Sequence, residues 1–172
     1  MDLAPSRRRP LDRAQYRVRW HYRDPPLAWL MTGAYLAHVV EEWFGGFPGW
    51  FVLVAGAPLP RDAFIIINAV GLAGIIGATR AAIRRESSGW MAIAVAALLL
   101  ANGLLHLLGS LITGKYSPGV LTGVILYFPL AQLVLLRAWL QTPRRVFALG
   151  VVAGVGVHAL VSLIAVIVAR AS

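Results

Sequence analysis

The chain has 172 residues, of which 59% are hydrophobic and 13% are charged, and its mean hydropathy is +0.72. This composition is typical of an integral membrane protein and argues against a soluble domain. The net charge is +9, but no DNA-reading motif accompanies it, so we expect no nucleic-acid partner. The sequence has no cysteine, so any metal must be held by His, Glu, Asp or Asn.

Residues 1–26 form a basic segment that contains seven of the 15 arginines and ends in Pro25-Pro26. A secretory signal would place an apolar core closer to the start, so we expect no cleavage here. Aromatic side chains among the arginines fit an interfacial helix on anionic lipid, and a disordered topology anchor fits them equally well.

Residues 27–44 are the first predicted membrane span, and they are the least hydrophobic because they contain His38, Glu41 and Glu42. The stretch is shorter than the roughly 20 residues that a bilayer core needs unless its charged end reaches the interface. Glycines and a proline then break the helix, and the aromatic run 50–57 is too short to cross. We predict an interfacial or re-entrant segment there, which serves as a membrane anchor or as a lid over the carboxylates.

Four longer apolar stretches follow, and each is long enough to cross a bilayer. They cover residues 62–83, 89–112, 120–140 and 146–169. The sequence therefore predicts an all-α fold, a polytopic bundle of five transmembrane helices that forms a single domain at 27–169. No internal repeat is visible, so an inverted-repeat transporter is not favoured.

The basic residues predict the orientation of this bundle. Of the 16 Lys and Arg residues, all but Arg61, Lys115 and Arg170 precede the first span or lie in the two connections on the same side. By the positive-inside rule the N-terminus is inside and the C-terminus is outside. We expect an integral protein of the bacterial inner (plasma) membrane.

Polar side chains recur inside the spans. His38 and Glu42 are four residues apart, so they lie on one face of the first span. Asn102, His106 and Ser110 also recur every four residues and form a polar stripe on the third span. At 1.5 Å per residue, His38 lies roughly 16 Å and His106 roughly 26 Å from the inner end. Since ionisable groups at membrane depth usually face a bundle interior or one another, we predict that these residues converge.

The fifth span contains His158, which by the same count lies roughly 18 Å from the inner end. A lone histidine on an apolar face is explained as well by packing and hydrogen bonding as by ligation. Its membership of the predicted site therefore stays open.

The stretch His38-Val39-Val40-Glu41-Glu42 matches the motif after which the HXXEE-domain family of membrane proteins is named. Asn102-x-x-x-His106 and Tyr116-Ser117-Pro118-Gly119 resemble the second and third signatures of that family. The resemblance covers about Ala28 to Pro129 and leaves out the basic segment and the fifth span. The family has no established activity, so the resemblance implies that these positions matter without supplying a reaction.

The residue types at these positions indicate a metal site. A histidine followed four residues later by another ligand, with a glutamate between them, is similar to the zinc-binding helices of zincin-type proteases. By this analogy His38 and Glu42 are ligands, Glu41 is the general base, His106 is the third ligand, and His158 is a further candidate. A His₂Glu set is typical of catalytic zinc, although a carboxylate in the place of the second histidine of the helix would suit the facial triad of non-haem iron equally well. We expect a divalent metal ion, with zinc favoured over iron.

The sequence thus predicts a metal-dependent intramembrane enzyme that hydrolyses a membrane lipid or a hydrophobic peptide. Glu41 would take a proton from the attacking water, and His106 or Tyr116 would steady the developing oxyanion, with Asn102 in support. The alternatives are a metal-free site in which Glu41 and Glu42 share a proton, a non-haem iron oxidoreductase, and a non-enzymatic carrier or sensor of metal, proton or lipid.

Overall fold

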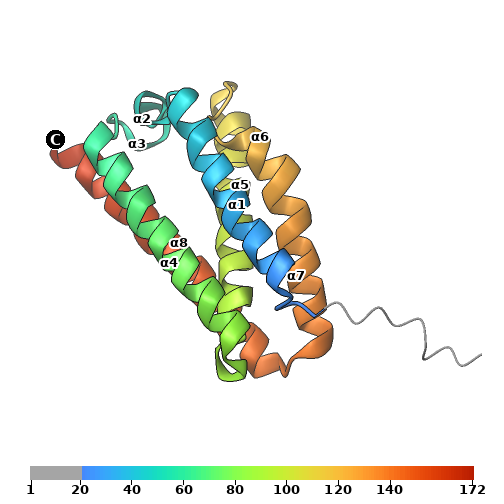
Figure 1. The fold of residues 1–172 in the computed structure, drawn as a ribbon. Coiled ribbons are helices and arrows are strands. Elements are labelled where there is room, and N and C mark those ends of the chain that lie inside the picture. The colour runs from blue at the N-terminus through green and yellow to red at the C-terminus, as the bar shows by residue number, and fades with distance from the viewer. Residues whose placement is uncertain (1–20) are drawn as a thin grey trace, which may run out of the picture.

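The computed structural model describes residues 21–172, so most of the predicted basic segment, residues 1–20, lies outside the described residues. The described residues form helices and no strand, which confirms the all-α prediction (Figure 1). The five longest helices are α1 (Pro25–Phe44), α4 (Arg61–Arg84), α5 (Trp90–Thr113), α7 (Phe128–Gln141) and α8 (Arg144–Ala171).

Short helical elements connect the long helices. They are α2 (Phe47–Trp50), α3 (Val52–Ala55), the 3₁₀ turn η2 (Glu86–Ser88), α6 (Val120–Thr122) and the π-helical segment η3 (Gly123–Tyr127). The elements α6, η3 and α7 follow one another without a break and together form the predicted fourth span. The π-helical segment ends just before Pro129, which has no N–H with which to continue the regular ladder.

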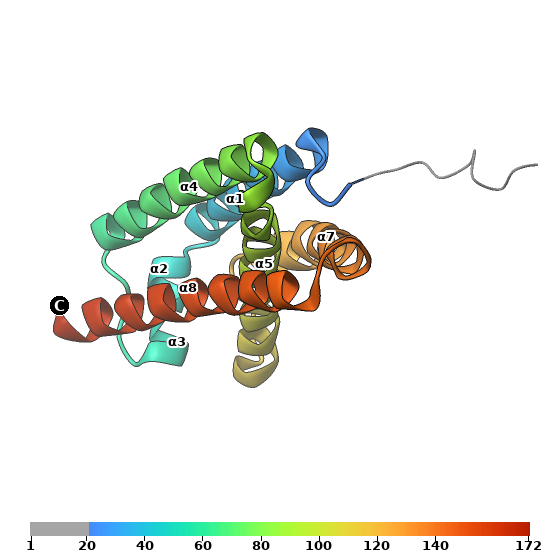
Figure 2. The same cartoon turned by 90° about the horizontal axis from the view of Figure 1, so that it is seen from below.

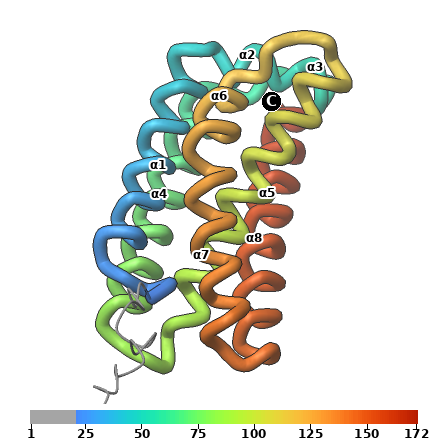
Figure 3. The backbone as a smooth tube through the Cα atoms, turned by 90° about the vertical axis from the view of Figure 1, so that its right-hand side faces the viewer, coloured from blue at the N-terminus to red at the C-terminus, as the bar shows by residue number. Residues whose placement is uncertain are grey.

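The long helices run in alternating directions, so that α1, α5 and α8 point one way and α4 and α7 the other (Figures 1 and 3). Seen from below, α5 lies at the centre of the bundle (Figure 2), and it contacts every other long helix. The short helices α2, α3 and α6 gather at the end where α1 and α5 finish (Figure 3). The predicted non-spanning aromatic run is thus found in α2 and α3.

Four helical stretches are long and apolar enough to cross a membrane, namely Arg61–Arg84, Glu86–Thr113, Val120–Gln141 and Arg144–Ala171. They match four of the five predicted spans. The helix α1 is not among them, because its prolines, His38 and two glutamates lower its hydropathy. Large apolar side chains such as Val70 on α4 and Val152 on α8 are exposed on the outside of the bundle. An outer surface this apolar fits lipid better than water.

Basic side chains collect at the end of the bundle where α1 begins, where α4 joins α5 and where α7 joins α8. We call this the basic end; its residues are Arg23, Arg80, Arg84, Arg85, Arg137, Arg144 and Arg145. The opposite end of the described bundle has Arg61, Lys115 and Arg170 (Figure 1). The two ends therefore differ in charge in the way that the sequence predicts.

Gly154 on α8 lies directly against the central helix α5. A Cβ atom at Gly154 would stand 2.1 Å from the carbonyl oxygen of Ala94, which is backbone and cannot rotate away. One turn earlier, a Cβ atom at Gly150 would stand 2.6 Å from the Cβ atom of Ile93. Small residues at such positions let two membrane helices approach closely. The strip at Gly150 and Gly154 therefore holds α8 against α5.

Gly154→Ala is expected to destabilise the protein by about 1–3 kcal/mol, the usual cost of forcing atoms into a packed contact. Gly156→Ala is the matched control, since no atom lies within 4 Å of a Cβ atom at that position. The measurement is the melting temperature in detergent, followed by the monodisperse fraction in gel filtration after heating. Equal melting temperatures for the two variants would contradict a close contact at Gly154.

Candidate metal centre

Two histidines and a glutamate from two helices meet inside the bundle. His38 and Glu42 lie one turn apart on α1, and His106 lies on α5. All three are buried, with exposed fractions of 1% for His38, 5% for Glu42 and 5% for His106. The Oε1 atom of Glu42 is 3.6 Å from His38 Nε2 and 3.3 Å from His106 Nε2. The structure therefore brings together the ligands that the sequence predicts on the first and third spans.

The spacing of these atoms fits ligands of a single ion. Ligand atoms about 2.1 Å from a tetrahedral zinc ion stand about 3.4 Å apart. The two distances from Glu42 Oε1 are close to this value, and one ligand atom from each residue lies within 4.8 Å of the others. His38, Glu42 and His106 can therefore hold a metal ion. A set of three protein ligands also leaves one tetrahedral position open.

The hydrogen bond behind His38 determines which of its nitrogens faces Glu42. His38 Nδ1 lies 2.8 Å from Thr122 Oγ1, and this hydroxyl donates to the Gly119 carbonyl at 3.3 Å. We infer from this second bond that the hydroxyl accepts from His38 and that Nδ1 carries the hydrogen. In the neutral imidazole, Nε2 is then an acceptor that faces a carboxylate oxygen and has no hydrogen-bond partner among residues 21–172. Two buried acceptors in contact require a cation between them, either a proton or a metal ion.

His106 is held in a similar way. Its Nδ1 atom lies 3.0 Å from Ser117 Oγ, so that Nε2 is the nitrogen that faces Glu42. The backbone N–H of Ser117 in turn donates to Ser110 Oγ at 2.9 Å. Ser110 belongs to the polar stripe that the sequence predicts on this helix. Each histidine thus has a hydroxyl behind it and the carboxylate in front of it.

Aromatic rings enclose the two imidazoles. Tyr127 of η3 stacks on His38, with ring centroids 4.6 Å apart. Phe47 of α2 lies 5.3 Å from the His106 ring, measured between centroids. The short helix α2 therefore packs against the cluster at the end of the bundle opposite the basic end. This position agrees with a covering role for the segment that follows the first span.

Glu41 contacts a different neighbour from Glu42. Its carboxylate accepts hydrogen bonds from the Tyr116 hydroxyl and from three backbone N–H groups, those of Gly119 at 2.9 Å, Leu121 at 3.1 Å and Thr122 at 2.7 Å. Three of these donors share Oε1, and the N–H group of Thr122 alone bonds to Oε2. The N–H groups belong to the start of α6, whose own N-cap residue makes no side-chain cap. Glu41 therefore caps α6 from α1, and its role as general base stays a prediction.

Tyr116 lies outside the helices, in the connection between α5 and α6, and is 55% exposed. Desolvation and the hydrogen bond to Glu41 raise the pKa of Tyr116 to about 12, so this hydroxyl remains a donor at neutral pH. The structure thus places Tyr116 next to Glu41, as a hydrogen-bond donor to its carboxylate.

Two other predicted residues carry buried polar atoms that have no hydrogen-bond partner in the described part of the chain. They are Oδ1 of Asn102, one turn before His106 on α5, and Nε2 of His158 on α8. His158 is not one of the three residues whose ligand atoms cluster, although it interacts electrostatically with His106 and Glu42. The parts predicted for Asn102 and His158 at the site stay predictions.

The sequence reasoning missed Thr122 and Tyr127, and it named Ser117 only as part of a motif that resembles a signature of the family. Thr122 and Tyr127 lie in the predicted fourth span, where their spacing shows no relation to a histidine in the first span. The one available signal is chemical. A metal-binding histidine needs a partner for its second nitrogen, and Ser and Thr near the start of a helix can supply one.

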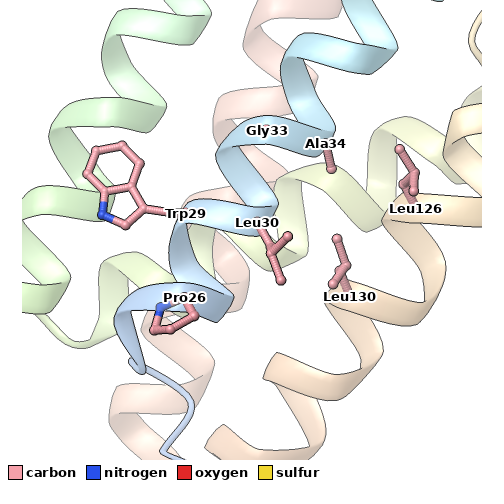
Figure 4. Close-up of a pocket in the computed structure, with 7 residues that line it drawn as sticks. All are labelled: Pro26, Trp29, Leu30, Gly33, Ala34, Leu126 and Leu130. Atoms are coloured by element: carbon pink, nitrogen blue, oxygen red, sulfur yellow. The ribbon is translucent and has the colours of Figure 1, made fainter.

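Apolar grooves lie elsewhere on the bundle. The larger has a volume of about 470 Å³ and lies between the first half of α1 and the η3–α7 segment, towards the basic end (Figure 4). Its lining consists of apolar residues and one tryptophan: Pro26, Trp29, Leu30, Gly33, Ala34, Leu126 and Leu130. None of these residues contributes a ligand atom, so this groove is separate from the cluster.

Comparison with known protein families identifies the chain. The family described as "protein of unknown function with HXXEE motif" matches residues 29–134, which is more than half of the chain. No curated protein and no solved structure matches. The matched region includes His38, Glu42 and His106 together with the hydroxyl residues behind the two histidines. The protein therefore belongs to the HXXEE family, whose function is unknown.

Proposed function

We propose that this protein is an integral membrane enzyme that uses a divalent metal ion, held by His38, Glu42 and His106, to hydrolyse a lipid or a hydrophobic peptide. The observation that carries this proposal is the bare His38 Nε2 atom, which faces Glu42 Oε1 at 3.6 Å in a buried position. A proton between them would satisfy the same pair. A second imidazole at 3.3 Å and a hydroxyl behind each ring are features that favour a metal ion.

Zinc is proposed ahead of iron, because two histidines and one carboxylate are a familiar ligand set of catalytic zinc. When bound, zinc supplies Lewis acidity and makes water a stronger acid. The chain itself supplies the fixed ligands, and the rings of Tyr127 and Phe47 keep the cluster away from bulk water.

A hydrophobic substrate is favoured by a second groove, which lies between α1 and α4. It has a volume of about 330 Å³, and its lining is mostly apolar, including Leu36, Val39 and Trp43. The hydrogen bond between Tyr35 and Asn68, 2.9 Å long, lies within this lining. Because α1 carries both this groove and two of the three ligands, an acyl or apolar side chain held there would lie beside the helix of the cluster.

We further propose that α1 is a fifth span, which places the N-terminus inside and the C-terminus outside. A helix of 20 residues is about 30 Å long, which is the thickness of the hydrocarbon core. Support comes from the position of α1 in the bundle beside α4 and α7, and from the charge of the basic end. The bacterial inner membrane is the proposed location.

Metal analysis of protein purified in detergent tests the ligands. Stoichiometric zinc is expected in the wild type. Glu42→Gln, His38→Ala or His106→Ala should each lower the zinc affinity by more than about 100-fold, which is a larger loss than removal of a residue that hydrogen-bonds to a ligand usually causes. Glu86→Gln and His21→Ala are matched controls that should keep the metal. Iron in the wild type would instead favour an oxidoreductase. A wild type without metal would contradict the metal site.

The absence of cysteine from the sequence allows the orientation to be tested with single-cysteine variants. Ser172 at the C-terminus and Ser87 between α4 and α5 are both exposed. A membrane-impermeant maleimide should label Ser172→Cys in intact cells and should label Ser87→Cys only after permeabilisation. The reverse pattern would overturn the proposed orientation, and labelling of both positions from outside would exclude the five-span arrangement.

Turnover of a total lipid extract, followed by mass spectrometry, separates an enzyme from a carrier. The wild type is expected to release a hydrolysis product, and Glu42→Gln is expected to lose this activity by at least about 100-fold, the range seen when a group that stabilises a transition state is removed. Glu86→Gln serves as the control. Metal binding without turnover of lipid or hydrophobic peptide would favour the carrier or sensor.

A further inference from the structure

We propose that Glu41 is a positioning residue, which holds the segment 117–122 against both histidines, and that Ser117 and Thr122 in this segment set the orientation and the protonated nitrogen of each ring. This inference rests on the proposed function, because the positioned groups are the proposed ligands. It assigns the two glutamates of the motif to different tasks, with Glu42 as a ligand and Glu41 as the residue that holds the ligands in place.

The first observation is that one short segment serves both histidines. Thr122 Oγ1 lies 2.8 Å from His38 Nδ1, and Ser117 Oγ lies 3.0 Å from His106 Nδ1. The two histidines come from different helices, so this segment is the element that relates the two rings to each other. Hydrogen bonds to the second nitrogen of a ligand histidine fix its tautomer and its orientation.

The second observation is that the backbone of this segment touches both rings. A Cβ atom at Gly119 would lie 2.6 Å from Cε1 of His38 and 2.8 Å from Cε1 of His106. Gly119 also has a φ of +106°, which side-chain-bearing residues rarely adopt. The main chain at Gly119 therefore packs against both imidazole rings, and the position of this main chain limits the distance between the two rings.

The third observation is how the segment is held. Three of its backbone N–H groups, those of Gly119, Leu121 and Thr122, donate to the carboxylate of Glu41, and the hydroxyl of Tyr116 donates to the same carboxylate. Glu41 and Glu42 are neighbours on α1 and point about 100° apart around the helix axis. One turn of α1 thus presents a ligand to α5 and a cap to α6, so the ligands cannot shift independently of the segment.

The hydroxyl contribution is tested by the zinc affinity of Thr122→Val, measured by competition with a chelating dye. The affinity is expected to fall by about 10–100-fold, as is usual when an outer partner of a ligand is removed. Thr122→Ser should retain the affinity. Thr142→Val is the matched control, because among residues 21–172 the Thr142 hydroxyl bonds to a carbonyl of the adjoining helix α7, that of Ala138. An unchanged affinity in Thr122→Val would overturn the proposed role of Thr122.

Glu41→Gln separates positioning from base catalysis. The amide of glutamine replaces one acceptor oxygen by a donor that opposes the backbone N–H groups of α6. If Glu41 positions the segment, the zinc affinity should fall about as much as in Thr122→Val, by about 10–100-fold. Full zinc affinity with lost lipid turnover would show a general base instead and would overturn the positioning role.

The protonated nitrogen of His38 provides a readout that needs no metal. In ¹⁵N spectra of the metal-free protein, His38 is expected as the Nδ1–H form in the wild type and in Thr142→Val, and as a mixture of tautomers in Thr122→Val and Glu41→Gln. A wild type that binds no zinc but shows this pattern would contradict the proposed function and would still support the positioning role. If the protein binds zinc and the His38 tautomer is unchanged in Thr122→Val and Glu41→Gln, the positioning role is contradicted and the proposed function is not.

Discussion

The buried carboxylate of Glu42 sets the requirement that the surrounding structure meets. A charged group out of contact with water is costly unless an opposite charge and hydrogen bonds compensate it. Here the carboxylate oxygen faces the Nε2 atoms of two imidazoles. The hydrogen of the neutral His38 ring is on Nδ1, where it bonds to the Thr122 hydroxyl on the other side of the ring. The pair can therefore hold a cation, either a proton or a metal ion, between its facing atoms. The cluster is for this reason a candidate binding site.

The two glutamates of the motif are adjacent in sequence and differ completely in surroundings. Glu42 faces the Nε2 atoms of two imidazoles, while Glu41 accepts hydrogen bonds from a hydroxyl and three backbone N–H groups. A carboxylate bonded to backbone N–H groups is suited to holding that backbone in place, and one that faces two imidazole nitrogens is suited to binding a cation with them. The difference arises from the helix geometry of α1, since neighbouring residues point about 100° apart and so meet different helices.

Much of this could be predicted from the sequence, and the exceptions have a common cause. Hydropathy and the positions of Gly and Pro predicted four spans that match helices in the structure, and spacing by four residues placed His38 with Glu42 and Asn102 with His106 on common faces. These are local properties of a helix. The partners of His38 and Glu41 are not local. Thr122 lies 84 residues from His38, and the N–H groups bound to Glu41 lie 78 to 81 residues away, so only the packing of the helices reveals them. The roles given to Glu41 and to His158 depended on such contacts.

The same contacts explain how the least apolar long helix can lie within the bundle. Taken alone, α1 lacks the hydropathy of the other four stretches, because His38, Glu41 and Glu42 replace apolar residues. In the bundle, α6 satisfies Glu41, Thr122 satisfies one side of His38, and His106 faces Glu42. Polar residues at membrane depth are tolerated when they are paired in this way. The residues that form the cluster are therefore also the residues that connect α1 to α5 and α6, so that the geometry of the site and the packing of its helix in the bundle depend on one set of interactions.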